Sequence, residues 1–558
     1  MEKKQIYQRN MLALSNSNPE LTAYITSLEN RTPLKIITSK TGYPVPAVSK
    51  RGRFIPFHST FDPIKEGYRY LKMGSKNGYK VVFGFGAGYH ILPFLPIKTI
   101  SGIIVIEKDA GLFKSILESI DLRNILLDSR VRILIDLPPE KIKEYILTHY
   151  FPAIFGDLQT LYLRSRYSME QSYFEIIIQA IKDVISKIAD DYTVQAHFGK
   201  KWFINTLSNL PVAQNTSITI PPVHSVIVTG AGPSLEDQIT QIKALKKDNF
   251  LLATDTSLPV LLNHDLLPNL VISIDCQQIS YHHFLQGYPK GIPLVLDLAS
   301  PPILTRQTDK TIFFSSGHPF SLYVSKNWRH FPIIDTSGGN VTHAALSLTE
   351  KLQAKRIYLF GVDYSYPQGK AYSRGTYIYP LFRSIESRVS PLESLLFTFI
   401  MRNKSIEKIK NNGMIIYTTK PMSSYRVRLE YLINTMDIEV IQKTCMGKPL
   451  NIKEANHPLS KTGTFHTLFS AGKSEKSWLE FIEEYHKKVR QLPPPYSPIN
   501  KYFKSLSSED KNIWLTQFPA AAAIRETEDI HELKGTDILE KVKVWSLSKI
   551  DRIVNQYR

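Results

Sequence analysis

The stretch VTGAGPSLE at residues 228–236 decides the fold. The apolar run 225–230 (SVIVTG) predicts a buried strand that leads directly into a glycine turn, and the pattern of 235–246 predicts a helix behind it. Glycines permit a tight turn, and proline suits a first helical turn because it lacks an N–H. Free N–H groups at a helix start favour an anion such as a nucleotide phosphate. A plain strand–helix turn is the alternative interpretation.

Further strand-like runs continue from this unit, with helical patterns between several of them. They are 250–254 (FLLAT), 270–275 (LVISID), 293–297 (PLVLD), 311–315 (TIFFS), 356–361 (RIYLFG) and 414–419 (MIIYTT). Alternating apolar runs and helices are typical of a parallel sheet with crossover helices. We therefore predict a doubly wound α/β domain over residues 219–440.

A second α/β pattern precedes it, over residues 1–218. Strand-like runs at 79–86 (YKVVFGFG), 102–107 (GIIVIE) and 131–135 (VRILI) alternate with helical segments, and 169–207 reads as a long amphipathic helix. Gly84-x-Gly86-x-Gly88 followed by Glu107 resembles a methyltransferase-type nucleotide loop, whose acidic residue would bind ribose hydroxyls. The companion catalytic motif is missing. We interpret this part as a degenerate Rossmann-like module for acceptor docking or assembly.

Length and composition agree with several domains. At about 150 residues per domain, 558 residues indicate three to four. Strand signals fade in residues 441–558, and helical patterns there predict a helical C-terminal domain. The 69 Lys and Arg exceed the 50 Asp and Glu by 19, but they are scattered and form no nucleic-acid-binding motif. We expect a solvated basic surface, an anionic ligand and no nucleic-acid partner.

The chain contains two cysteines, Cys276 and Cys445, which excludes a disulfide scaffold and a zinc site built from cysteines. The first residues contain no apolar signal-peptide core, and the apolar runs are strand-sized rather than membrane-sized. We expect a soluble cytoplasmic protein without stable membrane association.

Polar residues follow two predicted strands of the central domain. Asp255 and Thr256 follow 250–254, and Asp275 and Gln277 lie in residues 273–277 (SIDCQ), which close the strand predicted at 270–275. Ligands of open α/β sheets bind at the carboxyl ends of strands, so these side chains are candidates for ligand contacts or acid–base chemistry. Helix capping is the alternative, equally weighted for Asp255.

Two later loops carry further candidates. Residues 335–344 (DTSGGNVTHA) place small polar residues before a helix, which predicts either a second anion site or a capped helix start, with His343 packed on that helix. Residues 360–372 (FGVDYSYPQGKAY) end a strand and open a tyrosine-rich loop. Phenol O–H groups can donate hydrogen bonds to a leaving phosphate.

In order and spacing, Gly230-x-Gly232-Pro233-Ser234-Leu235, Thr336-Ser337-Gly338 and Gly361-Val362-Asp363 resemble motifs of bacterial sialyltransferases that use CMP-sialic acid. The same order occurs in the central domain of the Maf (motility-associated factor) proteins, which decorate flagellin with nonulosonic acids. The segments 58–66 (HSTFDPIKE) and 82–90 (VFGFGAGYH) resemble the Maf opening. The resemblance covers residues 50–430 and implies two Rossmann-like parallel-sheet domains, the central one sialyltransferase-like, and a helical tail.

The resemblance also implies roles for individual residues. It assigns nucleotide-sugar binding to Gly230, Gly232, Pro233, Ser234, Leu235, Asp255, Thr256, Gln277, Thr336, Ser337, Gly338, Asn340 and Asp363. Tyr366 and Tyr372 correspond to the tyrosines that stabilise the leaving phosphate, Tyr366 only if one inserted residue is allowed. No histidine base follows the tyrosine loop, so Asp275, His282, His283 and His318 are the candidate general bases.

The leading hypothesis is a cytoplasmic glycosyltransferase that moves a pseudaminic- or legionaminic-type acid from a CMP-activated donor to Ser or Thr of flagellin, in support of filament assembly and motility. No metal and no cofactor are expected, and self-association is left open. The first alternative is a 6-hydroxymethylpterin diphosphokinase-like enzyme, because such enzymes share the Gly-x-Gly-Pro-Ser-Leu start and use ATP with Mg²⁺. The second is a non-catalytic flagellin-binding factor.

Overall fold

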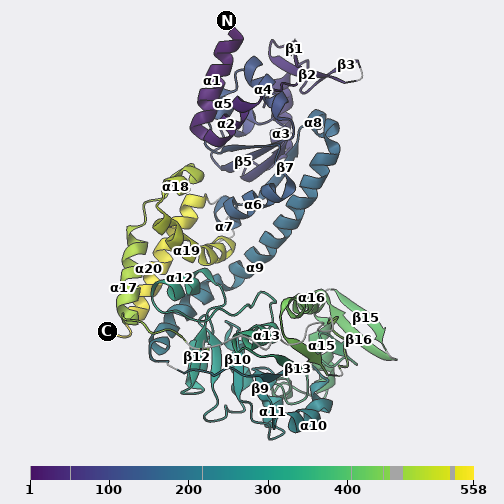
Figure 1. The fold of residues 1–558 in the computed structure, drawn as a ribbon, viewed down its shortest axis with the longest axis vertical. Coiled ribbons are helices and arrows are strands. Elements are labelled where there is room, and N and C mark those ends of the chain that lie inside the picture. Colours follow the sequence, from purple (N-terminus) through teal and green to yellow (C-terminus); the bar gives the residue numbers. More distant parts are fainter. Residues whose placement is uncertain are drawn as a thin grey trace. The chain divides into compact units, whose positions relative to one another are not determined.

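The computed structural model describes residues 2–558 except Arg51, Ser217, Lys404, Asn412, Thr444, 453–468, Ser470 and 528–533. Contacts divide the chain into two compact units, whose elements are labelled in Figure 1. The first unit contains residues 1–199 and 488–548, and the second contains residues 200–487 and 549–558.

The first unit contains a parallel sheet in the order β6-β5-β4-β7, which confirms the α/β pattern expected there. Its strands are β4 (Gly78–Phe83), β5 (Ile100–Glu107), β6 (Val131–Ile135) and β7 (Leu158–Tyr162). A small antiparallel sheet is formed by β1 (Lys35–Thr38), β2 (Pro44–Lys50) and β3 (Arg53–Pro56). Strands β4, β5 and β6 are mostly apolar and buried, as expected for a sheet covered on both faces, whereas the edge strand β7 is mostly half-buried.

The helices of this unit follow the predicted alternation. They are α1 (Glu2–Ser17), α2 (Pro19–Ser27), α3 (Pro63–Met73), η1 (Leu92–Phe94), α4 (Ala110–Ser119), α5 (Arg123–Leu126), α6 (Pro139–His149), α7 (Pro152–Phe155) and α8 (Arg164–Met169). The long helix expected at 169–207 is α9 (Gln171–Asn215), which contributes residues to both units.

The second unit is built on a seven-stranded parallel sheet in the order β12-β11-β10-β9-β8-β13-β17. The order reverses beside β8, because the chain builds outward from β8 to β12 and returns to the other side with β13. Such a reversal is where doubly wound sheets bind ligands. The strands are β8 (Ser225–Thr229), β9 (Phe250–Thr254), β10 (Leu270–Ser273), β11 (Leu294–Asp297), β12 (Thr311–Phe314), β13 (Arg356–Phe360) and β17 (Glu439–Gln442).

Residues 414–419 form a strand as expected, but not in the parallel sheet. This strand, β16 (Met414–Thr419), forms an antiparallel sheet with β14 (Tyr366–Pro367) and β15 (Ile406–Asn411), seen beside α15 and α16 in Figure 1. The hairpin turn before β16 reverses the chain, so β16 pairs with its neighbour in sequence. The last place in the parallel sheet is taken by β17, which crosses the expected boundary at residue 440.

The helices of the second unit connect these strands. They are α10 (Leu235–Leu245), α11 (Leu258–Leu262), η2 (Gln278–Phe284), η3 (Pro302–Arg306), α12 (Pro319–Asn327), α13 (Val341–Lys351), α14 (Ile378–Arg383), α15 (Leu392–Met401) and α16 (Lys420–Thr435). The predicted helices at 235–246 and 341–352 are confirmed to within one residue.

The described part of the C-terminal region is mainly helical, as expected. It contains α17 (Trp478–Gln491), α18 (Ile499–Ser505), α19 (Ser508–Thr527) and α20 (Gly535–Val554). These helices are shared between the two compact units, and 453–468 and 528–533 of the expected 441–558 domain lie outside the described residues. The three-domain division stays a prediction about which parts fold independently. Among the described residues, no helix combines the length and apolarity that crossing a bilayer requires.

Candidate functional site

The glycine turn after β8 packs against the turn after β13. The Gly230 N–H donates to the Phe360 carbonyl at 2.8 Å, and the Gly232 N–H donates to the Gly361 carbonyl at 2.8 Å. A Cβ at Gly230 would lie 2.6 Å from the Gly361 oxygen, so only glycine allows this approach. The expectation that these N–H groups are free for an anion is wrong, because the chain's own carbonyls accept them.

Asp363, which follows β13, holds the same turn in place through hydrogen bonds. One carboxylate oxygen accepts the Ser234 N–H at 2.9 Å, and the other accepts the N–H groups of Met446 (2.9 Å) and Gly447 (3.2 Å). Burial raises the pKa of Asp363, and these hydrogen bonds oppose the rise. Asp363 is predicted from the sequence to contact ligand. In the structure it is a buried positioning residue that joins three backbone segments.

The Pro-Ser-Leu part of the turn is also mostly enclosed. Leu235 is fully buried at the start of α10, Ser234 is 2% exposed, and Pro233 is buried before them. The Ser373 hydroxyl donates to the Gly232 carbonyl at 2.6 Å, which ties the tyrosine-rich loop to this turn. The segment therefore holds the loop of residues 361–377 beside the carboxyl ends of the strands.

Asp255 and Asp275 lie at the carboxyl ends of the adjacent strands β9 and β10. The Asp255 carboxylate is buried and accepts the Ser273 hydroxyl at 2.6 Å and the Thr256 N–H at 2.6 Å. Asp275 is half-buried and accepts the Gln277 N–H at 3.0 Å. Burial raises the pKa of Asp275, and the nearby Asp255 carboxylate adds to the rise. Asp275 is thus the more accessible of the two carboxylates, and its raised pKa suits it to accept a proton.

The tyrosine-rich loop brings phenols to these carboxylates. Burial raises the pKa values of Tyr366, Tyr372 and Tyr377, and the Arg402 guanidinium opposes the rise in all three. Asp255 raises the pKa of Tyr372 further. Such electrostatic effects act at short range, so Tyr372 and Tyr377 lie near both this cation and this carboxylate, and Tyr366 lies near the cation. This grouping agrees with the predicted convergence of the strand ends and the tyrosine-rich loop.

Two members of this site were not among the residues chosen from sequence. Tyr377 lies in the same loop, with its ring 6.2 Å from that of Tyr372, and its position among several tyrosines could have drawn attention. Arg402 follows α15, far along the chain, and its guanidinium lies 3.9 Å from the centre of the Phe399 ring. A lone arginine after a helix gives no sequence signal.

His283 contacts this group through Tyr377. Its ring meets the Tyr377 ring edge-on at 4.6 Å, and its positive form would lower the pKa of Asp275. His283 lies on η2, directly after the loop that carries Asp275. Of the candidate bases taken from sequence, Asp275 and His283 are therefore grouped with the tyrosines.

His318 belongs to a different cluster. It follows the edge strand β12, two strands from Asp275, which is about 10 Å at the usual strand spacing. Its ring stacks on Trp202 at 3.8 Å, and its Nε2 lies 3.7 Å from the Asp297 carboxylate. Burial lowers the pKa of His318 to about 4 and raises that of Asp297 to about 6. No described contact joins His318 to the tyrosine-rich loop.

The segment before α13 is a capped helix start, which was the alternative interpretation. The Asn340 side-chain oxygen accepts the His343 N–H at 3.1 Å and the Tyr364 hydroxyl at 3.2 Å. A Cβ at Gly338 would lie 2.2 Å from the His343 ring. His343 is packed, as expected, and its Nε2 lies 3.0 Å from Asp335.

The two hydroxyl residues of this segment differ in exposure. Ser337 is exposed and Thr336 is half-buried, and the Ser337 N–H donates to Asp335 at 2.8 Å. Ser337 and Thr336 therefore stay candidates for ligand contact, whereas Asn340 and Gly338 have structural roles in the described contacts.

The glycine loop of the first unit is filled by its own side chains. Glu107 forms an ion pair with Arg166 at 2.5 Å and accepts the Phe85 N–H at 2.9 Å, and both charged side chains are buried. His58 Nε2 accepts the Ala87 N–H at 3.0 Å. Glu107 is thus engaged by the protein itself and does not present a free carboxylate to a ribose.

Comparison with known proteins gives two kinds of relationship. A family model for 6-hydroxymethylpterin diphosphokinase MptE-like proteins matches residues 202–369. An uncharacterized protein of Treponema pallidum (strain Nichols) is 36% identical over 169 residues, which is 29% of this chain and 79% of the relative. Another from the same organism is 32% identical over 148 residues, and the match covers 26% of this chain and about half (52%) of that relative.

Among solved structures, a Maf glycosyltransferase from Magnetospirillum magneticum AMB-1 matches with a TM-score of 0.57 at 14% identity, over 99% of this chain and 97% of that one. The protein therefore has the Maf glycosyltransferase fold, with an MptE-like segment in its centre, as the motifs led us to expect. At the identity and coverage of the first treponemal match, the chain belongs to the same family as that Treponema pallidum protein.

Proposed function

We propose that the protein is a glycosyltransferase that moves a nonulosonic acid of pseudaminic or legionaminic type from a CMP-activated donor to Ser or Thr of flagellin. One observation carries the proposal: Tyr372 lies within electrostatic reach of Arg402 and of Asp255 at the carboxyl end of β9, and Tyr366 lies within reach of the same arginine. The Maf fold of the chain supports the same activity. In this proposal the enzyme acts in the cytoplasm and serves filament assembly and motility.

CMP is the leaving group in the proposed reaction. The bond between the anomeric carbon and the phosphate oxygen of CMP breaks, through an oxocarbenium-like transition state. Tyr366 and Tyr372 donate hydrogen bonds to the leaving phosphate, because burial holds both phenols in the protonated form. The Arg402 guanidinium neutralises the phosphate or the donor carboxylate.

The acceptor hydroxyl forms the new bond to the anomeric carbon. Its proton passes to the Asp275 carboxylate, whose raised pKa makes it a stronger base than an ordinary aspartate. His283 lies close enough to stabilise the Asp275 anion before the reaction. Asp255 keeps Asp275 basic through like-charge repulsion and takes no proton in this scheme.

The glycine turn has a supporting role in this proposal. Gly230, Gly232 and Asp363 fix the loop that carries Tyr366 and Tyr372, and Leu235 anchors the turn in the core. Thr256, Gln277, Thr336 and Ser337 remain the candidate contacts for the donor, since each is exposed or half-buried.

A pterin diphosphokinase activity is the second candidate, favoured by the MptE-like match. Transfer of a diphosphate from ATP needs carboxylates that can hold Mg²⁺. Asp255 already accepts hydrogen bonds from Ser273 and Thr256 on both oxygens, which leaves Asp275 as the freer carboxylate. We rank this activity below the transferase for that reason.

Calorimetry with CMP, CDP and ATP, with and without Mg²⁺, tests the proposal. We expect CMP to bind without Mg²⁺ and its affinity to fall at least tenfold in Arg402→Gln. Arg388→Gln, which removes an exposed arginine of the same unit, is the matched control and should bind CMP normally. Binding of ATP only with Mg²⁺ would favour the diphosphokinase. Absence of any nucleotide binding would favour a non-catalytic flagellin-binding factor.

A further inference from the structure

A cavity of about 410 Å³ lies in the first unit, away from the site described above. Its walls come from β6, the start of α7, α18 and α19. On one side are the aromatic rings of Phe151, Phe503 and Phe518, with centroids 5.0 Å apart for Phe151 and Phe518 and 6.0 Å apart for Phe503 and Phe518. These rings form a continuous apolar wall.

The polar lining of this cavity is cationic. Arg130, Arg132, Lys504 and Lys511 line it, and its lining contains no aspartate or glutamate. Arg130 forms an ion pair with Asp128, whereas none of the other three forms an ion pair within the described part of the chain. The Arg132 guanidinium donates a hydrogen bond to the Ser17 carbonyl at 2.8 Å. Burial and the Arg132 charge together lower the pKa of Lys504. Like charges held together without a counter-charge repel each other.

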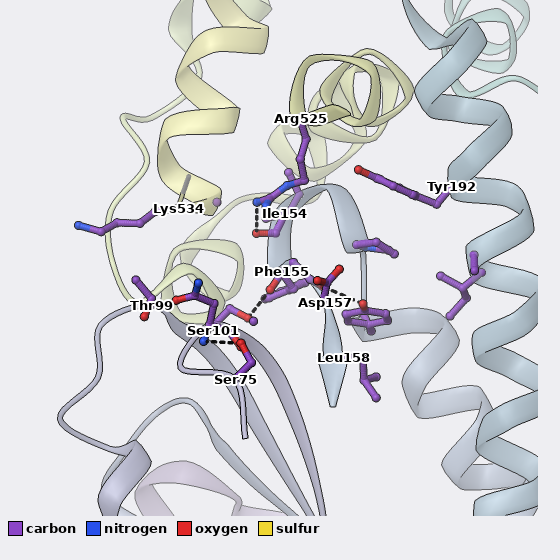
Figure 2. A pocket seen from close by; sticks show the side chains of 18 of the residues that line it. Ser75, Thr99, Ser101, Ile154, Phe155, Asp157, Leu158, Tyr192, Arg525 and Lys534 are labelled. Atoms are coloured by element: carbon purple, nitrogen blue, oxygen red, sulfur yellow. Dashed lines mark hydrogen bonds between the residues drawn. The ribbon is translucent and has the colours of Figure 1, made fainter. Parts of the chain in front are cut away.

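A neighbouring cavity of about 650 Å³ in the same unit lacks this imbalance. Figure 2 shows Asp157, Tyr192 and Arg525 extending toward the same space, and Glu526 and Lys534 also line it. Its two cations are matched by two carboxylates, so its charge favours no particular ligand. The contrast singles out the smaller cavity, where an apolar wall faces uncompensated positive charge.

We propose that the smaller cavity binds an amphipathic organic anion, a carboxylate or phosphate attached to an acyl or aromatic body. The anionic group lies between Arg132, Lys504 and Lys511 and supplies the missing counter-charge. The apolar body packs on Phe151, Phe503 and Phe518 and removes their surface from water. This site is independent of the transferase chemistry of the second unit.

Fluorescence titration of the full-length protein with 1-anilinonaphthalene-8-sulfonate tests the proposal. We expect decanoate or 1-naphthoate to displace the probe, whereas decanol lacks the charge and acetate lacks the body, and both should displace it at least tenfold less well. Displacement by only one of decanoate and 1-naphthoate would identify the body as acyl or aromatic. Absence of probe binding, or equal displacement by decanol, would overturn the proposal.

Lysine variants locate the site. Lys504→Gln combined with Lys511→Gln should weaken probe binding at least tenfold. The matched control, Lys72→Gln combined with Lys76→Gln, removes two exposed lysines of the same unit that do not line the cavity and should bind as the native protein does. Equal affinity of the two double variants would show that the probe binds elsewhere and would overturn the proposal.

A carboxylate introduced by substitution in the cavity wall gives a second test. Leu515 lines the cavity and is 41% exposed, so Leu515→Glu introduces a carboxylate with little loss of packing. We expect this variant to lose probe binding and to melt about 2 °C or more above Leu515→Gln, because the new carboxylate relieves the repulsion. Retained probe binding together with an unchanged melting temperature would contradict the proposal.

Discussion

Each unit contains a glycine turn after a strand of a parallel sheet, but the residues that surround the two turns differ. In the first unit the turn receives side chains, since a Cβ at Gly86 would lie 2.6 Å from His58 and one at Gly84 would lie 2.5 Å from Arg166. In the second unit the turn packs against backbone, the Gly361 carbonyl, and against the Asp363 carboxylate. Neither set of glycines leaves an empty cradle for a phosphate.

The difference lies in what the neighbouring strand ends present. In the first unit the strand-end carboxylate, Glu107, is neutralised by Arg166. In the second unit Asp275 remains half-buried, and its charge raises the pKa of Tyr377. Glycine spacing therefore encodes close approach of chain segments, whereas the chemistry depends on the polar groups that this approach leaves accessible.

The largest expected effect comes from filling the second turn. In Gly232→Ala the new methyl group would lie 2.3 Å from an Asp363 oxygen and 2.7 Å from the Gly361 oxygen. Movement of the Asp363 oxygen would break its hydrogen bond from the Ser234 N–H, and movement of the Gly361 oxygen would break its hydrogen bond from the Gly232 N–H. We therefore expect a loss of about 4 kcal/mol, seen as a lower melting temperature or insoluble protein. Gly317→Ala, with φ +91° and open space around it, should cost only about 1 kcal/mol. Equal losses would show that steric contact is not what requires Gly232.

The next largest expected effect distinguishes the buried carboxylate of Glu107 from that of Asp363. Glu107→Gln leaves the Arg166 charge buried and unpaired, so we expect a loss of about 3 kcal/mol in thermal or denaturant unfolding. Asp363→Asn should cost less, about 1–2 kcal/mol, because its partners are neutral N–H groups and the amide oxygen can still accept one. The combination Glu107→Gln with Arg166→Met should recover part of the first loss. A larger loss in Asp363→Asn would reverse this comparison.

The strands and helices could be predicted from the sequence more fully than the roles of individual site residues. The strands and helices around 228–236 were predictable because buried parallel strands are continuous apolar runs and helix starts carry clear signals. The strand at 414–419 was predictable as an element but not in its sheet, since sheet membership depends on the hairpin with β15. The roles of Gly232 and Asp363 were not predictable, because their partners Gly361, Met446 and Gly447 are more than 80 residues away. Arg402 reaches the site only through tertiary structure.

The tyrosine-rich loop gives the third effect. Tyr372→Phe removes one proposed hydrogen bond to the leaving phosphate and should lower the transfer rate about 100-fold, which corresponds to about 2.7 kcal/mol. Tyr431→Phe, in which the tyrosine is 74% exposed on α16, is the control and should keep the native rate. The measurement is the mass gained by flagellin in the presence of CMP-activated nonulosonic acid. Melting temperatures of the two variants should agree, so that a lower rate reports the reaction and not folding.

The smallest expected effect is a pH dependence of stability. It concerns the histidine–carboxylate contacts, His58 with Glu66 in the first unit and His318 with Asp297 in the second. Burial lowers the pKa of both histidines, but the Glu66 carboxylate, as acceptor and as a nearby negative charge, partly restores that of His58. In the second unit the raised pKa of Asp297, about 6, means that ionising this carboxylate between pH 4 and 6 lowers stability. The lowered pKa of His318, about 4, means that stability rises over pH 4 to 6.5, as the unfolded chain gives up its proton.

These two contributions to stability oppose each other over the same range, so single variants should separate them. His318→Phe keeps a ring on Trp202 and leaves Asp297, and its melting temperature should fall as pH rises from 4 to 6. Asp297→Asn leaves His318, and its melting temperature should rise over the same range. Each change is on the order of 2 kcal/mol, and the native protein should vary less than either variant. Parallel pH profiles in the two variants would contradict the assignment, because removing an acid with a raised pKa and a base with a lowered pKa cannot move the slope in one direction.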